Sequence, residues 1–375
     1  MGMIGGGEGA FIGPVHRMAA ELDGEIELVC GAFSSDPERS VRSGRSLYGL
    51  PEARCYPDYR TMLEEEATLD DAERMDLVAI TTPNHVHFDA AMAALAAGFH
   101  VICDKPLTHR LADALELEAK VDEAPLLFCL SHNYTGYPMV REARTLIADG
   151  RLGAIRRVSC EYLQGWLSTP EERSGNKQAA WRTDPERAGA AGCFGDIGSH
   201  GHNLIEFVTG ERIASVCADL STWVEDRPLD DDGNVLFRLA GGGKGVLSAS
   251  QIAVGEENNL TLRVYGERGG LEWSQMKPNT LVLRWPDRSV EHRRTGGPGV
   301  SAEAAAATRL PAGHPEGYLE AFAALYRDFA RAIRAERAGT TVQCDFPTVS
   351  DGVRGMRFIE AVVASSALGG EWREL

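Results

Sequence analysis

The chain has 375 residues, of which 43% are hydrophobic and 25% charged, as in an ordinary globular protein. Its length exceeds what one hydrophobic core usually organises, so two domains are expected. Lys and Arg number 38 against 55 Asp and Glu, a formal net charge of −17, which argues against nucleic acids and anionic membranes as partners.

The cysteines are scattered and none form a CxxC pair. Several stand inside apolar runs, so we expect reduced, buried thiols in a reducing compartment. Cys193 could instead be a reactive thiol, although a core position is favoured. No leader pattern and no apolar stretch long enough to cross a bilayer is present, so cytoplasmic residence is expected. The eight are Cys30, Cys55, Cys103, Cys129, Cys160, Cys193, Cys217 and Cys344.

A strand, a glycine-rich loop and a helix are predicted in succession at the N-terminus. Met1–Ile4 reads as the end of a strand, GGGEGAFIG follows at Gly5–Gly13, and a helical pattern runs from Val15 to Leu22. In this context Gly5-x-Gly7-x-x-Ala10 fits the fingerprint that brings a pyrophosphate to a helix N-terminus. The expected dinucleotide-binding residues of this loop are Gly5, Gly7, Ala10, Phe11 and Ile12.

The second predicted strand, Glu25–Phe33, is followed by residues that bear on the choice of cofactor. An acidic side chain here would bind the ribose 2′-hydroxyl of NAD, whereas hydroxyl and guanidinium groups suit the 2′-phosphate of NADP. The sequence offers Ser34, Ser35 and Arg39, while Asp36 is expected to cap the next helix, with a proline after it. The pattern favours NADP, and Asp36 leaves NAD open.

Further apolar strands are predicted at Asp76–Thr82, Phe99–Cys103 and Pro125–Ser131, alternating with helices. This alternation predicts a doubly wound parallel sheet, a Rossmann domain over residues 1–132. Ligands of such sheets bind outside the carboxyl ends of the strands. That edge is expected to carry Gly5–Gly13, Thr82–His87, Lys105 and His132–Tyr134.

The pattern changes beyond the predicted helix Met139–Asp149. Strand-like runs now follow one another with turns between them, which predicts an α+β domain at 133–375 with a large, open, mostly antiparallel sheet. A helix is expected at Gly201–Val208, two more at Glu316–Arg337 and Thr348–Ser366, and a mobile loop at Val300–Ala307. The expected strands are Ile155–Leu163, Val216–Val224, Val235–Leu239, Gly245–Val254, Leu260–Tyr265, Gly270–Trp273 and Leu281–Trp285.

The stretch GCFGDIGSHGHN at Gly192–Asn203 combines a carboxylate with an imidazole. Asp196 and His200 are four residues apart, so on a helix they leave the same face, and a carboxylate can tune a neighbouring imidazole for acid–base work. An ordinary N-cap with a satisfied histidine is the alternative. A metal site with His202 is disfavoured because no further ligand cluster accompanies it.

Several motifs together give the chain a resemblance to the Gfo/Idh/MocA family (glucose–fructose oxidoreductase, inositol dehydrogenase and rhizopine catabolism). Each is common alone, but their order across nearly the whole chain is specific. The matching elements are the glycine loop, Thr82-Pro83-Asn84-His85-x-His87, Asp104-Lys105-Pro106, Gly195-Asp196-Ile197-Gly198-x-His200 and His314-Pro315-x-Gly317-Tyr318.

The resemblance implies reversible hydride transfer between a nicotinamide and a secondary alcohol or ketone of a sugar or cyclitol, without a metal. Lys105 would bind the reacting oxygen, His200 would be the acid–base group, and Asp196 would orient His200 or hold a substrate hydroxyl. Further cofactor contacts would come from Thr82, Pro83, Asn84, His87, Asp104, Lys105, Asn133, Trp181 and Arg182. Substrate contacts would come from Lys105, Tyr162, Lys177, Arg182, Asp196, His200 and His314.

The chain departs from the family pattern in three places. The glycine loop is longer than the usual GxGxxG by about three residues. Asp104 stands where Glu is usual, and Asn203 stands where many members have Asp. These differences leave the phosphate donors open and suggest a substrate polarity unlike that of the inositol enzymes.

Two alternative functions fit the same scaffold. One is a member that retains its cofactor and cleaves glycosides by oxidation, elimination and re-reduction. The other is a non-catalytic protein that senses NAD(P). In each case a homodimer or homotetramer formed through the C-terminal sheet is expected, because large apolar sheet faces are rarely left in water and the family points the same way.

Overall fold

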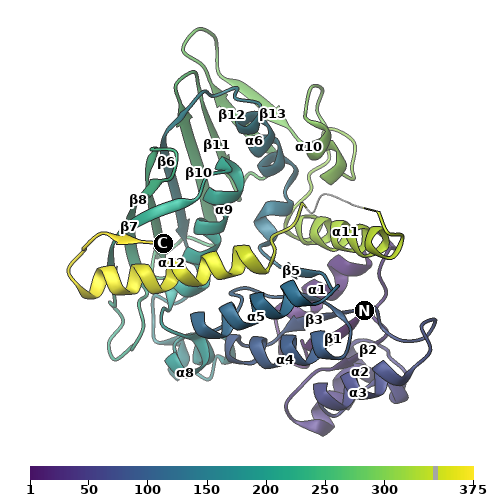
Figure 1. Ribbon diagram of the computed structural model, residues 1–375. Coiled ribbons are helices and arrows are strands. Elements are labelled where there is room, and N and C mark those ends of the chain that lie inside the picture. Colours follow the sequence, from purple (N-terminus) through teal and green to yellow (C-terminus); the bar gives the residue numbers. More distant parts are fainter. Residues whose placement is uncertain (341–344) are drawn as a thin grey trace. The chain divides into compact units, whose positions relative to one another are not determined.

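In the computed structural model, which describes residues 1–340 and 345–375, the chain divides into two compact units (Figure 1). Unit 1 comprises Met1–His132 with Phe322–Val353, and unit 2 comprises Asn133–Ala321 with Arg354–Leu375. Two long helices, α11 (Tyr318–Arg337) and α12 (Val349–Ala367), therefore each belong partly to both units. Both helices were predicted from the sequence within two residues of these bounds.

Unit 1 is built on a five-stranded parallel sheet in the order β2-β1-β3-β4-β5. Nearly every strand residue is buried, which explains why the strands read as continuous apolar runs. The predicted parallel sheet is confirmed. Its strands are β1 (Gly2–Gly5), β2 (Cys30–Ala32), β3 (Leu77–Thr81), β4 (His100–Cys103) and β5 (Phe128–Leu130).

The second strand is shorter than the predicted Glu25–Phe33. Its neighbour β1 begins at Gly2, which lies opposite Cys30, so the residues before Val29 have little ladder to join. The expected cap of the following helix is confirmed, because Asp36 accepts from the Arg39 backbone N–H at 2.8 Å. The connecting helices are α1 (Ile12–Glu21), α2 (Pro37–Leu47), α3 (Tyr59–Thr68), α4 (Asn84–Ala96) and α5 (Leu111–Glu123).

Unit 2 contains a nine-stranded sheet in the order β13-β12-β11-β10-β6-β9-β8-β7-β14. All neighbours are antiparallel except β6 and β9, so the predicted mostly antiparallel sheet is confirmed. The strands are β6 (Ile155–Leu163), β7 (Ile213–Ser221), β8 (Asp232–Leu239), β9 (Lys244–Ser250), β10 (Asn259–Gly266), β11 (Gly270–Ser274), β12 (Thr280–Arg284), β13 (Glu291–Arg294) and β14 (Arg373–Glu374).

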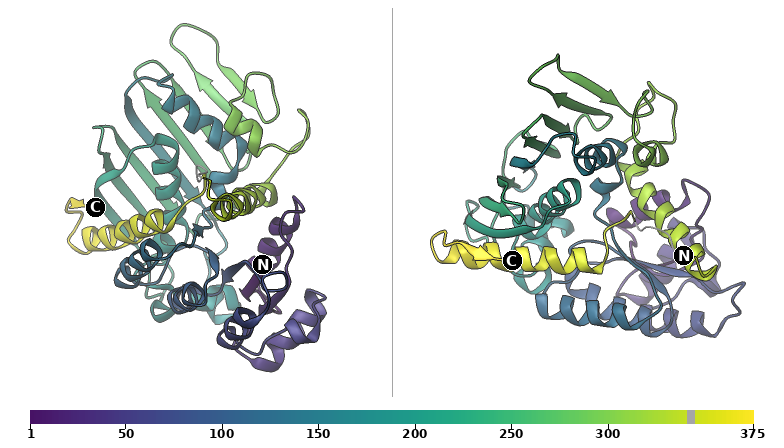
Figure 2. Two further views of the ribbon diagram at one scale, coloured as in Figure 1. Left: turned by 45° about the vertical axis from the view of Figure 1, so that its right-hand side comes forward. Right: turned by 45° about the horizontal axis from the view of Figure 1, so that its top comes forward.

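Helices α6 (Pro138–Ala148) and α9 (Ser199–Thr209) pack on one face of this sheet (Figure 2). Burial alternates along the strands as a result: Val235 and Phe237 of β8 are buried, whereas Leu236 between them is 53% exposed. Strands β13 and β14 were not predicted, because neither carries an apolar alternation. Two short helices, α7 (Lys177–Arg182) and α8 (Pro185–Ala188), precede α9.

The expectation of a mobile loop at Val300–Ala307 is wrong. These residues form helix α10 (Ala302–Ala307), which Ser301 caps and whose Ala304 and Ala307 are wholly buried. Wholly buried Glu142 of α6 accepts from the Ser301 backbone N–H at 2.7 Å and forms an ion pair with Arg293 of β13. The stretch 296–313 is rich in Gly as well as Ala, but its alanines favour a helix, and the Glu142 carboxylate anchors the helix start.

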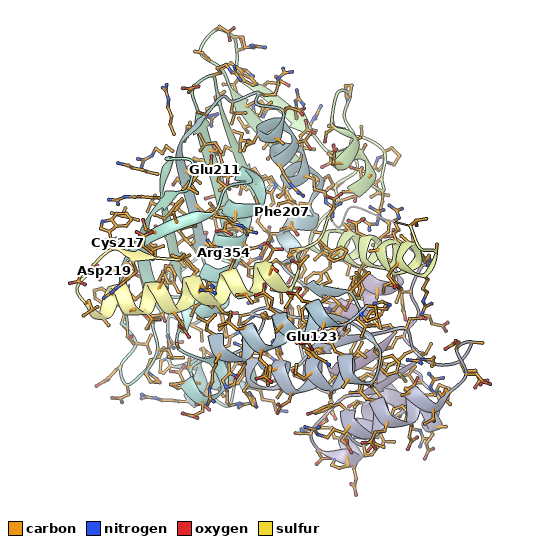
Figure 3. The ribbon with its side chains drawn as sticks, viewed as in Figure 1. Glu123, Phe207, Glu211, Cys217, Asp219 and Arg354 are labelled. Atoms are coloured by element: carbon orange, nitrogen blue, oxygen red, sulfur yellow. The ribbon has the colours of Figure 1, made fainter. Side chains whose placement is uncertain are left out.

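A buried carboxylate also joins α9 to α12 and β7. Glu206 accepts from Arg354, labelled in Figure 3, at 2.7 Å and from the Ile213 backbone N–H at 2.8 Å. Burial acts to raise the pKa of Glu206, but His202, Arg354 and Arg212 outweigh burial and hold that pKa below its usual range. The carboxylate therefore stays charged and fixes one end of α9.

None of the described cysteines forms a disulfide. Six are buried and Cys217 is half-buried, whereas Cys344 lies outside the described residues. Burial raises the pKa of the Cys193 thiol well above its ordinary value, which supports a core position and not a reactive nucleophile. Within residues 1–340 and 345–375, no helix is both long and apolar enough to cross a membrane.

Candidate active site

The glycine-rich turn between β1 and α1 brings a strand and a helix unusually close. Gly5 and Gly6 have φ of +90° and +78°, which favours glycine. A Cβ on Gly13 would lie 2.2 Å from the Cα of Gly6, so Gly13 permits α1 to pack against the turn that follows β1. Ala10, the third position of the predicted fingerprint, closes a turn by donating its N–H to the Gly7 carbonyl at 2.9 Å.

The start of α1 presents unused backbone donors. Among the residues that the structure describes, the N–H groups of Phe11 and Ile12 have no hydrogen-bond acceptor. Phe11 is 60% exposed and its side chain does not cap the helix. A helix N-terminus with free N–H groups attracts anions, so this end of α1 suits a phosphate.

The carboxyl end of β2 carries a hydroxyl and a guanidinium in contact. Arg39 Nε donates to Ser34 Oγ at 2.8 Å, and the same hydroxyl accepts from the Asp36 N–H at 3.1 Å. Ser35 and Asp36 are exposed. Because Asp36 caps α2, one of its carboxylate oxygens is already engaged by the Arg39 backbone.

Two turns at the ends of β3 and β4 are tied together by His87, which stands in the first turn of α4. The ring is wholly buried, with Nδ1 2.8 Å from the Pro106 carbonyl and Nε2 2.9 Å from the Thr82 carbonyl. Burial lowers the pKa of His87. Beside it, Pro83 and the buried Asn84 begin α4. His87 is thus a link between backbone turns of this edge.

Lys105 follows β4 on a backbone that Asp104 holds. Asp104 Oδ1 accepts from the Lys105 N–H at 2.9 Å and from Ser131 Oγ at 3.0 Å. The Lys105 side chain is half-buried. Since β1 to β4 are parallel neighbours, their carboxyl ends bring the predicted unit 1 residues to one edge of the sheet.

In unit 2, Asp196 lies in a π-helical turn, Phe194–Gly198, that runs directly into α9. Its Oδ2 accepts from Arg182 Nε at 3.1 Å and from Gln251 Nε2 at 2.9 Å. Arg182 also stacks over the Trp181 ring at 4.2 Å. The carboxylate is therefore fixed by two donors from different segments, and π-helical turns of this kind are frequent at functional sites.

Asp230 anchors the entry to that turn. Its carboxylate accepts from the N–H groups of Gly192 and Phe194 at 2.7 and 2.8 Å, and its backbone carbonyl accepts from Cys193 at 2.8 Å. A Cβ on Gly192 would lie 2.3 Å from the Asp230 carbonyl oxygen, so glycine is required there. Burial raises the pKa of Asp230.

His200, on the first turn of α9, is 8% exposed and lies among aromatic hydroxyls. Its ring centroid is 4.9 Å from that of Tyr134 and 6.1 Å from that of Tyr162. The two tyrosine hydroxyls hydrogen-bond each other, and Tyr162 donates to Asn258 Oδ1 at 2.7 Å. Burial raises the pKa of both tyrosines, so they are neutral hydrogen-bonding groups.

The remaining predicted residues are not part of the hydrogen-bonded clusters around Asp196 and His200. Lys177 and His314 are exposed, and His314 Nδ1 lies 3.2 Å from the carbonyl of Pro311, three residues earlier in the chain. Asn133 is buried, and its Nδ2 has no partner among the described residues. His202 stacks on Phe358 at 4.6 Å and lies beside Glu206.

No group of three or more metal-ligating side chains is found within residues 1–340 and 345–375. Sequence reasoning missed Asp230, Gln251 and Asn258. Each is a polar residue beside a strand end, without a motif that could have marked it.

Comparison with known proteins gives matches along most of the chain. Residues 1–132 match an oxidoreductase family model with an NAD-binding Rossmann fold, and residues 140–272 match the GFO/IDH/MocA C-terminal domain. An uncharacterised oxidoreductase of Bacillus subtilis, YfiI, is 33% identical over 99% of this chain and 95% of its own.

Two further relatives have more informative names. An inositol dehydrogenase homologue from Azotobacter vinelandii, solved with NAD+, is 36% identical with a TM-score of 0.96, covering 100% of this chain and 96% of its own. Levoglucosan dehydrogenase of Pseudarthrobacter phenanthrenivorans is 27% identical over 78% of each chain. The chain therefore belongs to the Gfo/Idh/MocA family of oxidoreductases, with an NAD(P)-binding Rossmann domain.

Proposed function

We propose that this enzyme transfers a hydride reversibly between a nicotinamide dinucleotide and a secondary alcohol or ketone of a sugar, sugar derivative or cyclitol. The observation that carries the proposal is the hydrogen-bonded cluster of hydroxyl and amide groups beside His200. Tyr134, Tyr162 and Asn258 hydrogen-bond one another there, next to a fixed Asp196. Side chains that both donate and accept suit a substrate with several hydroxyl groups.

The proposed roles follow from the chemistry of alcohol oxidation. The dinucleotide supplies the hydride acceptor when it is bound. An alcohol that loses hydride must also lose a proton, and His200 is proposed to take it. Lys105 is proposed to stabilise the developing negative charge on the same oxygen with its ammonium group. Asp196 is proposed to hold a neighbouring hydroxyl or to orient His200. In the reverse direction His200 returns the proton.

The Lys105 backbone is well suited to carry this role. Asp104 accepts from its N–H, and His87 lies between the carbonyls of Thr82 and Pro106, which follow β3 and β4 at the same edge of the sheet. These contacts fix the main chain from which the ammonium extends, and a fixed main chain supports orientation of a catalytic group.

The test is a spectrophotometric panel of inositols, anhydrosugars and aldoses with NAD and NADP. The proposal expects turnover of at least one polyol, and Lys105→Met and His200→Asn should each lower kcat/KM by about a hundredfold or more while dinucleotide binding persists. Tight dinucleotide binding without turnover of any compound would contradict it. Release of free sugar from a glycoside without added dinucleotide would instead favour the cofactor-retaining glycosidase.

We propose NADP as the dinucleotide, on the grounds of the Ser34–Arg39 pair. A guanidinium held by a hydroxyl at the end of β2 suits a 2′-phosphate, and Asp36 is engaged in capping α2. NAD is the alternative, supported by the NAD+ in the Azotobacter vinelandii homologue. The ratio of the two dissociation constants decides between them.

We also propose that the enzyme is a homodimer or homotetramer formed through the sheet of unit 2. Helices cover one face of that sheet, and Leu236 is more than half exposed on the other. Arg238 of the same strand stacks over Trp372 at 4.0 Å. Apolar and aromatic groups of this kind support an interface. Light scattering after size-exclusion chromatography tests it, and a monomer at micromolar concentration would contradict it.

A further inference from the structure

Side chains of helix α2 and of its C-terminal cap hydrogen-bond the backbone of the glycine-rich turn. The Tyr48 hydroxyl, at the C-terminal end of α2, donates to the Gly6 carbonyl, and Ser43 Oγ accepts from the Glu8 N–H at 3.2 Å. Both side chains are buried, and Tyr48 stacks on Phe33 with 4.7 Å between ring centroids. Burial raises the pKa of Tyr48 to about 12, so its hydroxyl remains a donor. One carbonyl and one amide of the turn are thereby fixed.

These contacts also determine which amides of the turn are left for a ligand. The Gly7 N–H belongs to the same peptide unit as the Gly6 carbonyl and donates to the Phe33 carbonyl at 3.0 Å. That peptide is therefore held on both sides, and the Glu8 N–H is taken by Ser43. The N–H groups of Phe11 and Ile12, further along, are among those that have no acceptor within the described part of the chain.

The turn needs such support because its sequence is flexible. Gly5, Gly6 and Gly9 all have positive φ, and glycine loses more conformational entropy on ordering than any other residue. The turn is also longer than the usual dinucleotide fingerprint by about three residues. When a loop is already ordered, ligand binding has a smaller entropic cost, because the conformational entropy of the loop was lost on folding.

We propose that Tyr48 and Ser43 are positioning residues of the dinucleotide site. They fix the extended turn so that the amides of Phe11 and Ile12, at the positive end of α1, bind the pyrophosphate. Neither side chain is proposed to touch the ligand itself. The inference rests on the dinucleotide-binding part of the proposed function and is independent of the sugar.

The test compares Tyr48→Phe and Ser43→Ala with wild type, and Tyr59→Phe, a tyrosine on α3, serves as the matched control. Calorimetry gives the dissociation constants of NADH, NADPH and ADP-ribose, and thermal melting gives the stability of each unliganded protein. We expect Tyr48→Phe and Ser43→Ala to raise each measurable constant about three- to tenfold, the effect of one lost hydrogen bond. The binding of ADP-ribose should weaken as much as the binding of NADH, because both compounds carry the same pyrophosphate. The dinucleotide KM should rise while the sugar KM stays constant.

The possible outcomes distinguish a failure of the positioning role from a failure of dinucleotide binding itself. Dissociation constants that stay at the wild-type value in both variants would overturn the positioning role. If Tyr48→Phe does not fold, Ser43→Ala decides alone, because it removes the acceptor of the Glu8 N–H and leaves the Tyr48 contacts in place. A wild-type protein that binds none of the three compounds would instead refute dinucleotide binding itself.

Discussion

Gln251, in the loop after β9, donates its side-chain amide to Oδ2 of Asp196 at 2.9 Å. The same oxygen accepts from Arg182 of α7. Gln251 lies 55 residues after Asp196 in the sequence and Arg182 lies 14 residues before it, so three separate segments meet at one carboxylate. Gln251 is 2% exposed, and its own backbone is fixed by hydrogen bonds to Asp231 and Leu167. The position of Asp196 thus depends on residues that no motif contains.

Replacing Gln251 with Met should weaken catalysis while keeping the volume of the side chain. A hydrogen bond to a charged group is worth roughly 1.5–3 kcal/mol, so kcat/KM should fall about tenfold or more. A carboxylate that loses a donor is protonated more easily, so the acidic limb of the pH–rate profile should move to higher pH. Gln275→Met, a half-buried turn residue before β12, is the control. A profile identical to that of the control would refute the role of Gln251.

Acid should destabilise the protein partly through buried histidines of unit 1. Burial lowers the pKa of His16, although nearby Asp104 opposes the shift, and Nδ1 of His16 lies 2.6 Å from the Tyr326 hydroxyl. Burial lowers the pKa of His87 and His100 as well. Because the unfolded chain binds protons that the folded one does not, stability is lost as pH falls below about 6.5, the ordinary histidine value.

The His16→Phe variant isolates one of these protons. Its free energy of unfolding should depend on pH less steeply than that of wild type, by up to about 1.4 kcal/mol per pH unit below pH 6.5. Denaturant unfolding at a series of pH values from neutral downward measures the difference. Parallel pH dependences in the two proteins would mean that His16 takes up no proton on unfolding.

Glu142→Gln should destabilise unit 2 by about 3 kcal/mol, because it leaves the partly buried Arg293 guanidinium without its buried counter-charge. The α10 helix should also lose protection from hydrogen exchange, since Ser301 would lose a charged acceptor. Glu291→Gln is the matched control, because that carboxylate also pairs with Arg293 but is 40% exposed, and it should cost about 1 kcal/mol or less. Equal melting temperatures of the two variants would contradict the prediction.

Arg39→Ala should distinguish the dinucleotides. If Arg39 binds a 2′-phosphate, the dissociation constant of NADPH should rise about tenfold or more, whereas that of NADH should change little. Calorimetry with both compounds measures the ratio. If the wild-type protein binds NADH more tightly than NADPH, and Arg39→Ala leaves the ratio of the two dissociation constants unchanged, the site is specific for NAD.

The sequence was sufficient where a periodic or terminal signal exists. Buried parallel strands, the Asp36 cap and the two C-terminal helices follow from local pattern, and their types were predicted correctly. The 300–307 segment was not, because its order depends on Glu142, 159 residues away from Ser301. The fingerprint was predicted at Gly5, Gly7 and Ala10, and the close packing of Gly13 on Gly6 could not be predicted because the loop is longer than the usual pattern.

The assignment of Phe322–Val353 to unit 1 has a consequence for anyone who wishes to produce the cofactor-binding half by itself. A fragment that stops at residue 132 would lose Tyr326 beside His16 and the Pro347 carbonyl that accepts from Leu130. It would expose the apolar surface that these residues cover and should aggregate. A fragment with the missing segment appended through a flexible linker is the shortest version that we expect to fold.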